Sequence, residues 1–354
     1  MAIQWMDDFG SYGFTESYML NGLYAALSTG GSSFTLQTDP DVGATNIVGR
    51  FTDGTDNDYC TGPRKVLSST VTTAGAAARF WPASLPATNN AYPVFFSFRT
   101  NANARIVDVG ILSTGAIVAR NFVTGVFHET TGPVMVANGW QHVEVKVVID
   151  SVVGSIEVRV EGVTVLNVTG IDTGTNGVAQ VAFAGERNLT VGFPTFYFKD
   201  FVLWDGTGSY NNDFLGSVSV VALTPDSDNS FNWAASTGSV GYVLIDESSP
   251  DDADYISAID PPPAASTFGL TNLPPDVTSV KGLMTLVRAR KTDGGDGSLQ
   301  TSLVSNAVDA NGADRPITTA YTYWYDIHEV DPDTTAPWTP VAVDAALLKL
   351  DRTV

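Results

Sequence analysis

The clearest pattern in the chain is an alternation of apolar and polar positions in its middle. Apolar residues occupy every second position from Val143 to Ile149, and polar residues fill most of the positions between them. This period of two predicts a half-buried strand. Residues 156–161 alternate in the same way, and residues 163–166 follow a turn at Gly162. Three alternating segments joined by turns predict an antiparallel meander.

Further strand-like segments lie on both sides of this meander. Residues 94–99, 105–109 and 116–119 precede it and are rich in branched and aromatic side chains. Residues 196–204 follow it and show little sign of a solvent-facing side. We expect this last segment to be an interior strand that is covered on both faces.

The second half of the chain alternates predicted strands with turn clusters. Residues 217–223, 283–289 and 321–327 have the composition of strands. Only the segment after Trp338 favours a short helix, with Thr339 as its N-cap and a proline at its first position, and residues 347–350 are a predicted closing strand. The pattern predicts an all-β protein with at most one or two short helices.

Residues 205–213 bring Gly, Asn and Ser together directly after the aromatic strand. Clusters of this kind mark loops and linkers, so we place the domain boundary there. The chain of 354 residues is then divided into domains 1–205 and 206–354, and each is long enough to bury a core of its own.

Charge and composition exclude several classes of protein. The chain carries 18 Lys and Arg against 38 Asp and Glu, a formal net charge of -20. This charge repels phosphate backbones and anionic bilayers, so neither nucleic acid nor membrane insertion is expected. The start of the chain lacks the pattern of a secretory signal, and its single cysteine, Cys60, excludes an internal disulfide. We expect a soluble, globular protein.

The first domain resembles the concanavalin A-like, laminin G-like jelly-roll sandwich. The matching residues are 139–145, the hairpin 150–154, the strand end 161–163 and the aromatic strand 196–204. The early segment 7–9 also fits, because the first and last strands of such sandwiches lie side by side. The resemblance covers most of residues 1–205 and implies two antiparallel sheets packed face to face.

The second domain resembles a recurrent module of tailed-bacteriophage virion proteins, where it follows a laminin G-like domain. The motifs that carry the resemblance lie at residues 205–208, 212–216, 223–226, 233, 251–257, 289–291, 331–334 and 337–339. The resemblance spans 206–354 and implies a second β-sandwich. It also implies a non-enzymatic structural protein on the exterior of a phage particle, as a tail fibre, tail-associated or capsid decoration component.

The resemblance to a virion module also implies a location and a set of partners. The protein is expected in the virion, after synthesis in the host cytoplasm without a signal peptide. Its expected partners are other virion proteins and copies of itself. A lectin-like adhesin that binds host-surface glycan is an alternative role for the jelly roll.

A polysaccharide hydrolase is a third hypothesis, because some glucanases share the jelly-roll fold and use carboxylates at alternate positions of one strand. Glu157 and Glu161 are the nearest candidates, with Arg159 between them. Their strand buries its other face, so we expect these side chains to form a solvated outer face. His128 and Glu129 begin like a zinc-protease motif but lack a second histidine one turn later. The sequence therefore predicts no enzyme.

Two acidic loops have oxygen ligands at alternate positions, which suits Ca²⁺. One contains Asp53, Asp56 and Asp58, and the other contains Asp226 and Asp228. Neither loop has the glycine and glutamate of a helix-loop-helix site. Ordinary turns and Ca²⁺ sites both stay open for these residues, and no other cofactor is predicted.

Aromatic side chains are candidates for binding or for the core. Five tryptophans can stack on sugar rings or fill the two sandwiches; they are Trp5, Trp81, Trp204, Trp233 and Trp324. A second group lies on one predicted strand, whose two faces both carry aromatics although only one can face its own core. These residues predict a subunit interface: Tyr321, Tyr323, Trp324 and Tyr325.

Overall fold

The structure is a computed structural model that describes residues 2–12, 23–24, 33–52, 63–87, 92–185, 195–247, 249–259 and 262–354. It divides into two units. The first contains residues 24–220 with 1–9 and 14–20, and the second contains residues 221–354 with 10–13 and 21–23. The candidate Ca²⁺ ligands Asp53, Asp56 and Asp58, and also Cys60, lie outside the described residues.

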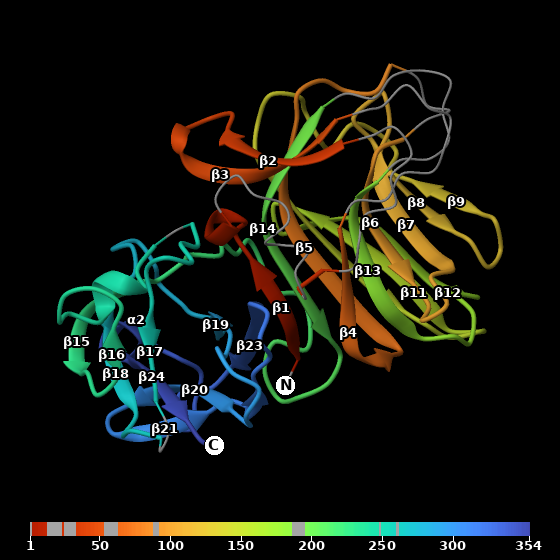
Figure 1. The fold of residues 1–354 in the computed structure, drawn as a ribbon. Helices are drawn as coiled ribbons and strands as arrows, with labels where there is room; N and C mark the ends of the chain where they lie inside the picture. The colour runs from red at the N-terminus through yellow and green to blue at the C-terminus, as the bar shows by residue number, and fades with distance from the viewer. Residues whose placement is uncertain are drawn as a thin grey trace. The chain divides into compact units, whose positions relative to one another are not determined.

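The first unit contains two antiparallel sheets, which we call sheet A and sheet B (Figure 1). Sheet A has the strand order β12-β11-β10-β5-β14-β3-β2, with β1 paired to β14, and sheet B has the order β4-β13-β6-β7-β8-β9. The strands of sheet A are β1 (Ile3–Asp7), β2 (Ser33–Asp39), β3 (Gly43–Thr52), β5 (Thr73–Pro82), β10 (Gln141–Val148), β11 (Gly154–Val160), β12 (Val163–Ile171) and β14 (Phe196–Asp205). Those of sheet B are β4 (Arg64–Val71), β6 (Val94–Arg99), β7 (Arg105–Ile111), β8 (Ile117–Asn121), β9 (Phe127–Glu129) and β13 (Val178–Gly185).

Aromatic side chains from the two sheets meet in the core of this unit. Phe80 of sheet A stacks on Phe95 of sheet B with ring centroids 4.3 Å apart. Phe201 of sheet A lies 4.3 Å from Phe183 of sheet B. All four side chains are buried. Aromatic pairs of this kind stabilise a core beyond the area that they bury.

The predicted arrangement of strands in this unit is confirmed. Strands β10, β11 and β12 form the antiparallel meander, with Val145 opposite Val158. The first and last strands lie side by side, because β1 pairs with β14 and places Trp5 opposite Leu203. Strand β14 also pairs with β5 and β3, so it is an interior strand of the sheet, as predicted. The expectation that both of its faces are covered holds for residues 200–205, whereas Tyr197 and Lys199 keep part of their surface accessible to solvent.

The second unit consists of three smaller antiparallel sheets. The largest, sheet C, has the order β15-β18-β24-β20-β21, with β22 paired to β20, and the others are the pairs β16-β17 and β19-β23. The strands are β15 (Pro225–Ser230), β16 (Ala234–Ala235), β17 (Ile256–Ser257), β18 (Ser266–Leu270), β19 (Leu283–Ala289), β20 (Ser298–Ser305), β21 (Val308–Asn311), β22 (Arg315–Pro316), β23 (Thr322–His328) and β24 (Leu347–Arg352). Phe268, Leu299 and Leu350 of sheet C pack with Val287 of β19 in its core.

Helices are few and short among the described residues. They are η1 (Gly10–Tyr12), η2 (Tyr242–Leu244) and α2 (Pro340–Asp344). The predicted helix start is confirmed, because the Thr339 hydroxyl accepts a hydrogen bond from the Ala342 N–H at 3.2 Å and Pro340 takes the first helical position. The predicted closing strand is β24, which lies between β18 and β20. The protein is therefore all-β, as predicted.

The predicted strand over residues 217–223 is wrong. The structure has no strand there, and β15 begins only at Pro225, after the end of the predicted strand. The reason is that the preceding segment bonds to side chains of the first unit instead of to a neighbouring strand. Val220, for example, donates its N–H to the Asp200 carboxylate. Residues 206–220, which the sequence assigns to the second domain, belong with the first unit.

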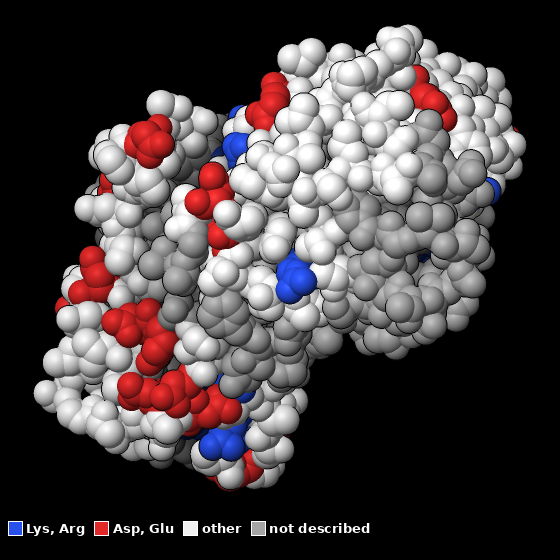
Figure 2. Space-filling view, turned by 90° about the horizontal axis from the view of Figure 1, so that it is seen from above, with Lys and Arg blue, Asp and Glu red and all other residues white. Residues whose placement is uncertain are grey.

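The surface carries the negative charge that the composition predicts. Acidic side chains gather on the face shown in Figure 2, where basic ones are few. No helix within the described part of the chain has the length and apolar character needed to cross a membrane.

Candidate functional site on the outer face of sheet A

Sheet A has one face turned to the core and one turned away from it, which we call the outer face. Val143, Val145 and Val147 of β10 point to the core and are fully buried. Glu144 and Lys146 alternate with them and therefore lie on the outer face. Arg159 lies opposite Glu144, and Glu157 lies opposite Lys146, on neighbouring β11. Two carboxylates and two cations thus share this part of the face.

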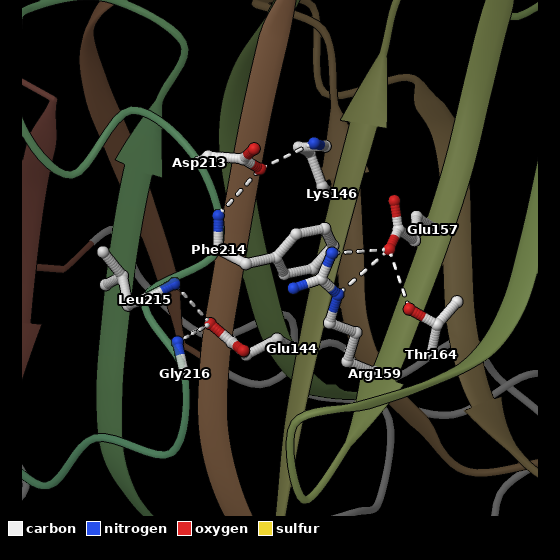
Figure 3. Close-up of polar contacts among 9 residues, drawn as sticks. All are labelled: Glu144, Lys146, Glu157, Arg159, Thr164, Asp213, Phe214, Leu215 and Gly216. Carbon is white, nitrogen blue, oxygen red and sulfur yellow. Dashed lines mark hydrogen bonds and ion pairs between the residues drawn. The ribbon is translucent and has the colours of Figure 1, made fainter.

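Residues 213–217 cover these charged side chains, and we call them the strap (Figure 3). The Glu144 carboxylate accepts hydrogen bonds from the backbone N–H of Leu215 at 2.8 Å and of Gly216 at 3.2 Å. Glu144 has no solvent-exposed area. A buried carboxylate needs such partners, since an uncompensated charge in the interior is costly.

The first two residues of the strap, Asp213 and Phe214, contact the sheet through a charge and an aromatic ring. Asp213 accepts a hydrogen bond from the Lys146 ammonium at 2.6 Å. The Phe214 ring lies 3.7 Å from the Arg159 guanidinium and 4.8 Å from the Lys146 ammonium. Its centroid is 6.3 Å from that of Trp204. Cations over an aromatic face are attracted by its electron density, so these contacts hold the strap on the sheet.

The two carboxylates that resemble a glucanase pair are not brought together on one strand. Glu157 accepts hydrogen bonds from Arg159 at 3.0 Å and from the Thr164 hydroxyl at 3.0 Å, and its side chain is only 16% exposed (Figure 3). Glu161 follows the last residue of β11 and has a backbone φ of 48°. Its carboxylate accepts a hydrogen bond from the backbone N–H of His142 at 2.7 Å. Glu157 lies on the outer face, as predicted, but Arg159 and the neighbouring strand shield it from most of the solvent.

Two titratable groups beside the strap have pKa values shifted by burial. Burial, together with the charge of Arg79, lowers the pKa of His142 to about 4. Burial raises the pKa of Asp200 to about 6, although the Val220 N–H and Arg79, whose Nε lies 3.3 Å away, favour the charged form. Both groups therefore titrate in the mildly acidic range.

An aromatic row crosses the other end of the outer face. Thr35, Arg50, Tyr197 and Trp81 are register partners on the neighbouring strands β2, β3, β14 and β5. Register partners point to the same face of a sheet. Trp140, directly before β10, meets Trp81 edge to face with ring centroids 5.8 Å apart. We call these five residues the aromatic row.

The rings of the aromatic row are half-buried, whereas their neighbours along the strands are in the core. Trp81, Trp140 and Tyr197 each keep part of their surface accessible to solvent. Phe196 and Phe198, on either side of Tyr197, are fully buried. The row is thus a line of partly exposed aromatic rings on the sheet, and this is a common setting for a binding site.

Polar groups accompany these rings. Trp140 donates its indole N–H to Asp39 at 3.1 Å, and Lys199 pairs with the same carboxylate at 2.6 Å. Within the described residues, Arg50 Nε and Thr35 Oγ1 are buried and have no hydrogen-bond partner. Buried polar groups normally have a hydrogen-bond partner, so a ligand or a water molecule is expected to supply one for these two atoms.

The row contains one of the five tryptophans that the sequence singles out. Trp81 lies in it, whereas Trp5 and Trp204 are fully buried and Trp233 and Trp324 are partly buried in the second unit. The other four residues of the row do not stand out in the sequence as a group, because their strands are far apart in the chain. Only the alternation in residues 196–199 signals that Tyr197 faces away from the core.

The two described candidate metal ligands, Asp226 and Asp228, accept hydrogen bonds from nearby residues of the second unit. Asp226 accepts a hydrogen bond from Ser227 at 2.9 Å, and Asp228 accepts the backbone N–H groups of Gly241 and Tyr242 at 2.8 and 2.7 Å. Within the described ranges, no three His, Cys, Asp or Glu side chains gather closely enough to hold a metal ion. Cation binding at these two residues stays a prediction.

The predicted interface strand is β23 in the second unit. Tyr323 is buried, and Trp324 and Tyr325 are partly buried. The Arg288 guanidinium lies 4.1 Å from the Tyr321 ring and 5.8 Å from the Tyr323 ring. A subunit contact on this strand stays a prediction.

Comparison with known proteins finds solved structures that are similar to this chain. No family model matches the chain, and no curated protein matches it. A solved alginate lyase, Aly36B, is 12% identical with a TM-score of 0.38 and matches over 57% of this chain and 95% of its own. A Bacillus licheniformis β-glucanase is 15% identical with a TM-score of 0.37, over 56% and 96%.

The receptor binding domain of botulinum neurotoxin type G is 14% identical with a TM-score of 0.32, and the match covers 49% of this chain. The chain spans only 43% of that domain. All three TM-scores lie below 0.5, so these matches carry no conclusion about the activity, substrate or partners of this chain.

The comparisons correct one prediction. The sequence predicts that the chain is not an enzyme, and this prediction is contradicted, because an alginate lyase and a β-glucanase are among the matching structures.

Proposed function

We propose that the first unit binds carbohydrate through the aromatic row, as a surface component of a tailed-phage particle. The observation that carries the proposal is the line of half-buried rings from Tyr197 to Trp140, next to the unsatisfied donor of Arg50. Binding sites combine an apolar surface with a few placed polar groups, and this row has both.

The chemistry of the row suits a saccharide chain. The C–H faces of sugar rings pack on aromatic rings, and sugar hydroxyl groups hydrogen-bond to fixed donors and acceptors. The residues of the row lie on adjacent strands, which are about 4.8 Å apart. A line of contacts at this spacing fits an extended chain of rings better than one compact molecule.

The attachment to a phage particle is supported by the motifs of residues 206–354, which resemble a virion module. The proposed partners are other virion proteins and further copies of this chain. Mass spectrometry of purified particles tests this part of the proposal. Particles that lack the chain would overturn it, whatever the chain binds.

Glycan binding is tested with the full-length chain on an array of bacterial surface saccharides, followed by titration calorimetry with each hit. The variant Tyr197→Ala removes a ring from the row, and we expect it to weaken binding at least tenfold. Tyr210→Ala is the matched control, because Tyr210 is 39% exposed in the same unit outside the row. Its affinity should stay within twofold of wild type.

Two results would contradict the binding proposal. One is an array on which the wild-type chain binds no saccharide. The other is a Tyr197→Ala variant with unchanged affinity. The bound saccharides are also analysed for shortened products, which would show that the chain cleaves what it binds.

A further inference from the structure

A second cluster lies on the face of sheet B that is turned away from the core, and we call it the arginine face. Ser97, Asp108 and Arg120 are register partners on β6, β7 and β8, while the residues beside Asp108, Val107 and Val109, are fully buried. The cluster is completed by three further arginines from β4, β6 and β7: Arg64, Arg99 and Arg105.

Positive charge is in excess on this face. Arg105 pairs with Asp108 at 3.1 Å. Arg99 donates to the neutral oxygens of Ser97 and Asn103, and Arg64 donates to the Gln180 amide. In the described part of the chain, four arginines thus share one carboxylate. The protein has a net charge of -20 and only 18 basic residues, so this local excess runs against its overall charge.

The arginines act on one another and on the carboxylate. Burial lowers the pKa of Arg99 to about 10, although the charge of Asp108 opposes the shift, and the charges of Arg105 and Arg64 contribute to it. Asp108 is fully buried, and its Oδ1 has no hydrogen-bond partner among the described residues. Among the described residues, the face therefore holds concentrated positive charge that one carboxylate, Asp108, balances only in part.

The guanidinium of Arg120 is fixed by two aromatic rings and keeps a donor that no described residue pairs with. Its guanidinium lies 4.2 Å from the Phe122 ring and 5.1 Å from the Phe127 ring. Its Nε is buried and has no partner within the described residues. A guanidinium fixed on aromatic rings presents a flat fork of N–H donors, which matches the oxygens of a carboxylate or sulfate group.

We propose that the arginine face binds an oxyanion, namely the carboxylate or sulfate group of an acidic saccharide or of a small anion. The ligand supplies the negative charge that Asp108 alone does not provide, and it satisfies the N–H groups of Arg120. The site lies on a different sheet from the aromatic row, and the inference does not depend on the function proposed for that row.

Calorimetric titration of the full-length chain tests the inference at constant ionic strength, with sodium chloride as the balancing salt. The probes are sodium sulfate, sodium glucuronate, an oligogalacturonate, and a neutral oligosaccharide of the same length. We expect saturable binding of at least one charged probe and none of the neutral one. Binding of sulfate and glucuronate indicates a site for free anions, whereas binding of the oligomer alone indicates a saccharide site.

The variant Arg120→Gln removes the charge of the stacked arginine, and we expect it to weaken anion binding at least tenfold. Arg290→Gln is the matched control, because Arg290 also lies on an aromatic ring, 4.7 Å from that of Tyr321, in the second unit. The control should bind within twofold of wild type.

Asp108→Asn is expected to raise anion affinity, and a misfolded variant would not produce such a gain. It removes the carboxylate that competes with the ligand and keeps the shape of the side chain, so we expect anion affinity to rise threefold or more. Absence of saturable binding by the wild-type chain would overturn the inference. So would unchanged affinity of Arg120→Gln, equal binding of the neutral and charged oligosaccharides, or a folded Asp108→Asn that binds anions no better than wild type.

Discussion

The buried carboxylate of Glu144 accepts the backbone N–H of Leu215 at 2.8 Å, across 71 positions of sequence. This bond fastens the strap to the centre of sheet A. Glu144 also accepts the N–H of Gly216, so one side chain satisfies two backbone donors that have no strand partner. The segment after β14 is therefore part of the first unit in its energetics as well as in its position.

Replacing Glu144 with glutamine should destabilise the first unit by about 1–2 kcal/mol, because hydrogen bonds to a charged acceptor are stronger than those to a neutral one. Urea unfolding measures the change, and hydrogen exchange at Leu215 and Gly216 should become faster. Glu129→Gln is the control, since Glu129 is exposed, and it should change stability by less than about 0.5 kcal/mol. Unchanged exchange at the two amides would contradict this account of the strap.

The contact between Phe214 and Arg159 should appear as a coupling energy in a double-mutant cycle. Phe214→Leu and Arg159→Met each keep an apolar side chain but remove the ring or the charge. We expect a coupling of about 0.5–1 kcal/mol, the size of a cation-π pair near the surface. Unfolding free energies of the wild type, both single variants and the double variant give the value. Strictly additive effects would show that the ring and the guanidinium do not interact.

Gly75→Ala should be among the most destabilising small substitutions in the chain. An added Cβ at Gly75 would overlap the indole ring of Trp204 on the adjacent strand. Forcing extra atoms into a packed position costs about 1–3 kcal/mol. Thermal unfolding followed by tryptophan fluorescence measures the loss.

Gly139→Ala is the control for this substitution, because nothing lies within 4 Å of its added Cβ. Its effect should be neutral or slightly stabilising, since alanine restricts the unfolded chain. Equal stability of the two variants would contradict the packing of Trp204 on Gly75.

His142 should make the stability of the first unit depend on pH. Its pKa is about 4 in the folded protein and about 6.5 when unfolded. Between these values the unfolded state binds more protons, so the contribution of His142 is complete above pH 6.5 and is lost as the pH falls to 4. Asp200 acts in the opposite sense, because its pKa is raised to about 6.

The variant His142→Gln separates the two effects. The stability of the wild type minus that of the variant should fall as the pH is lowered from 7 to 4.5, while Asp200 contributes equally to both proteins. Urea unfolding at a series of pH values gives this difference. A difference that does not change with pH would show that His142 titrates normally.

Several elements follow from the sequence for simple physical reasons. The meander β10–β12 follows from a period of two, since alternate side chains of a strand point to opposite faces. Helix α2 follows from Thr339 and Pro340, whose effects are local. Strand β15 does not follow, because its six residues are mostly polar and exposed and its pairing with β18 is made by the backbone.

The sequence by itself determined that this protein is built of antiparallel strands, where the most regular of them lie, and that its surface is acidic. These properties depend on neighbouring residues or on simple sums over the chain. Only the tertiary structure decided that Glu144 binds the strap, that Tyr197 lies beside Trp81, and that Arg120 faces Asp108. Each of these pairs joins strands or segments separated in the sequence, and strand order and register, which no local pattern encodes, bring them together.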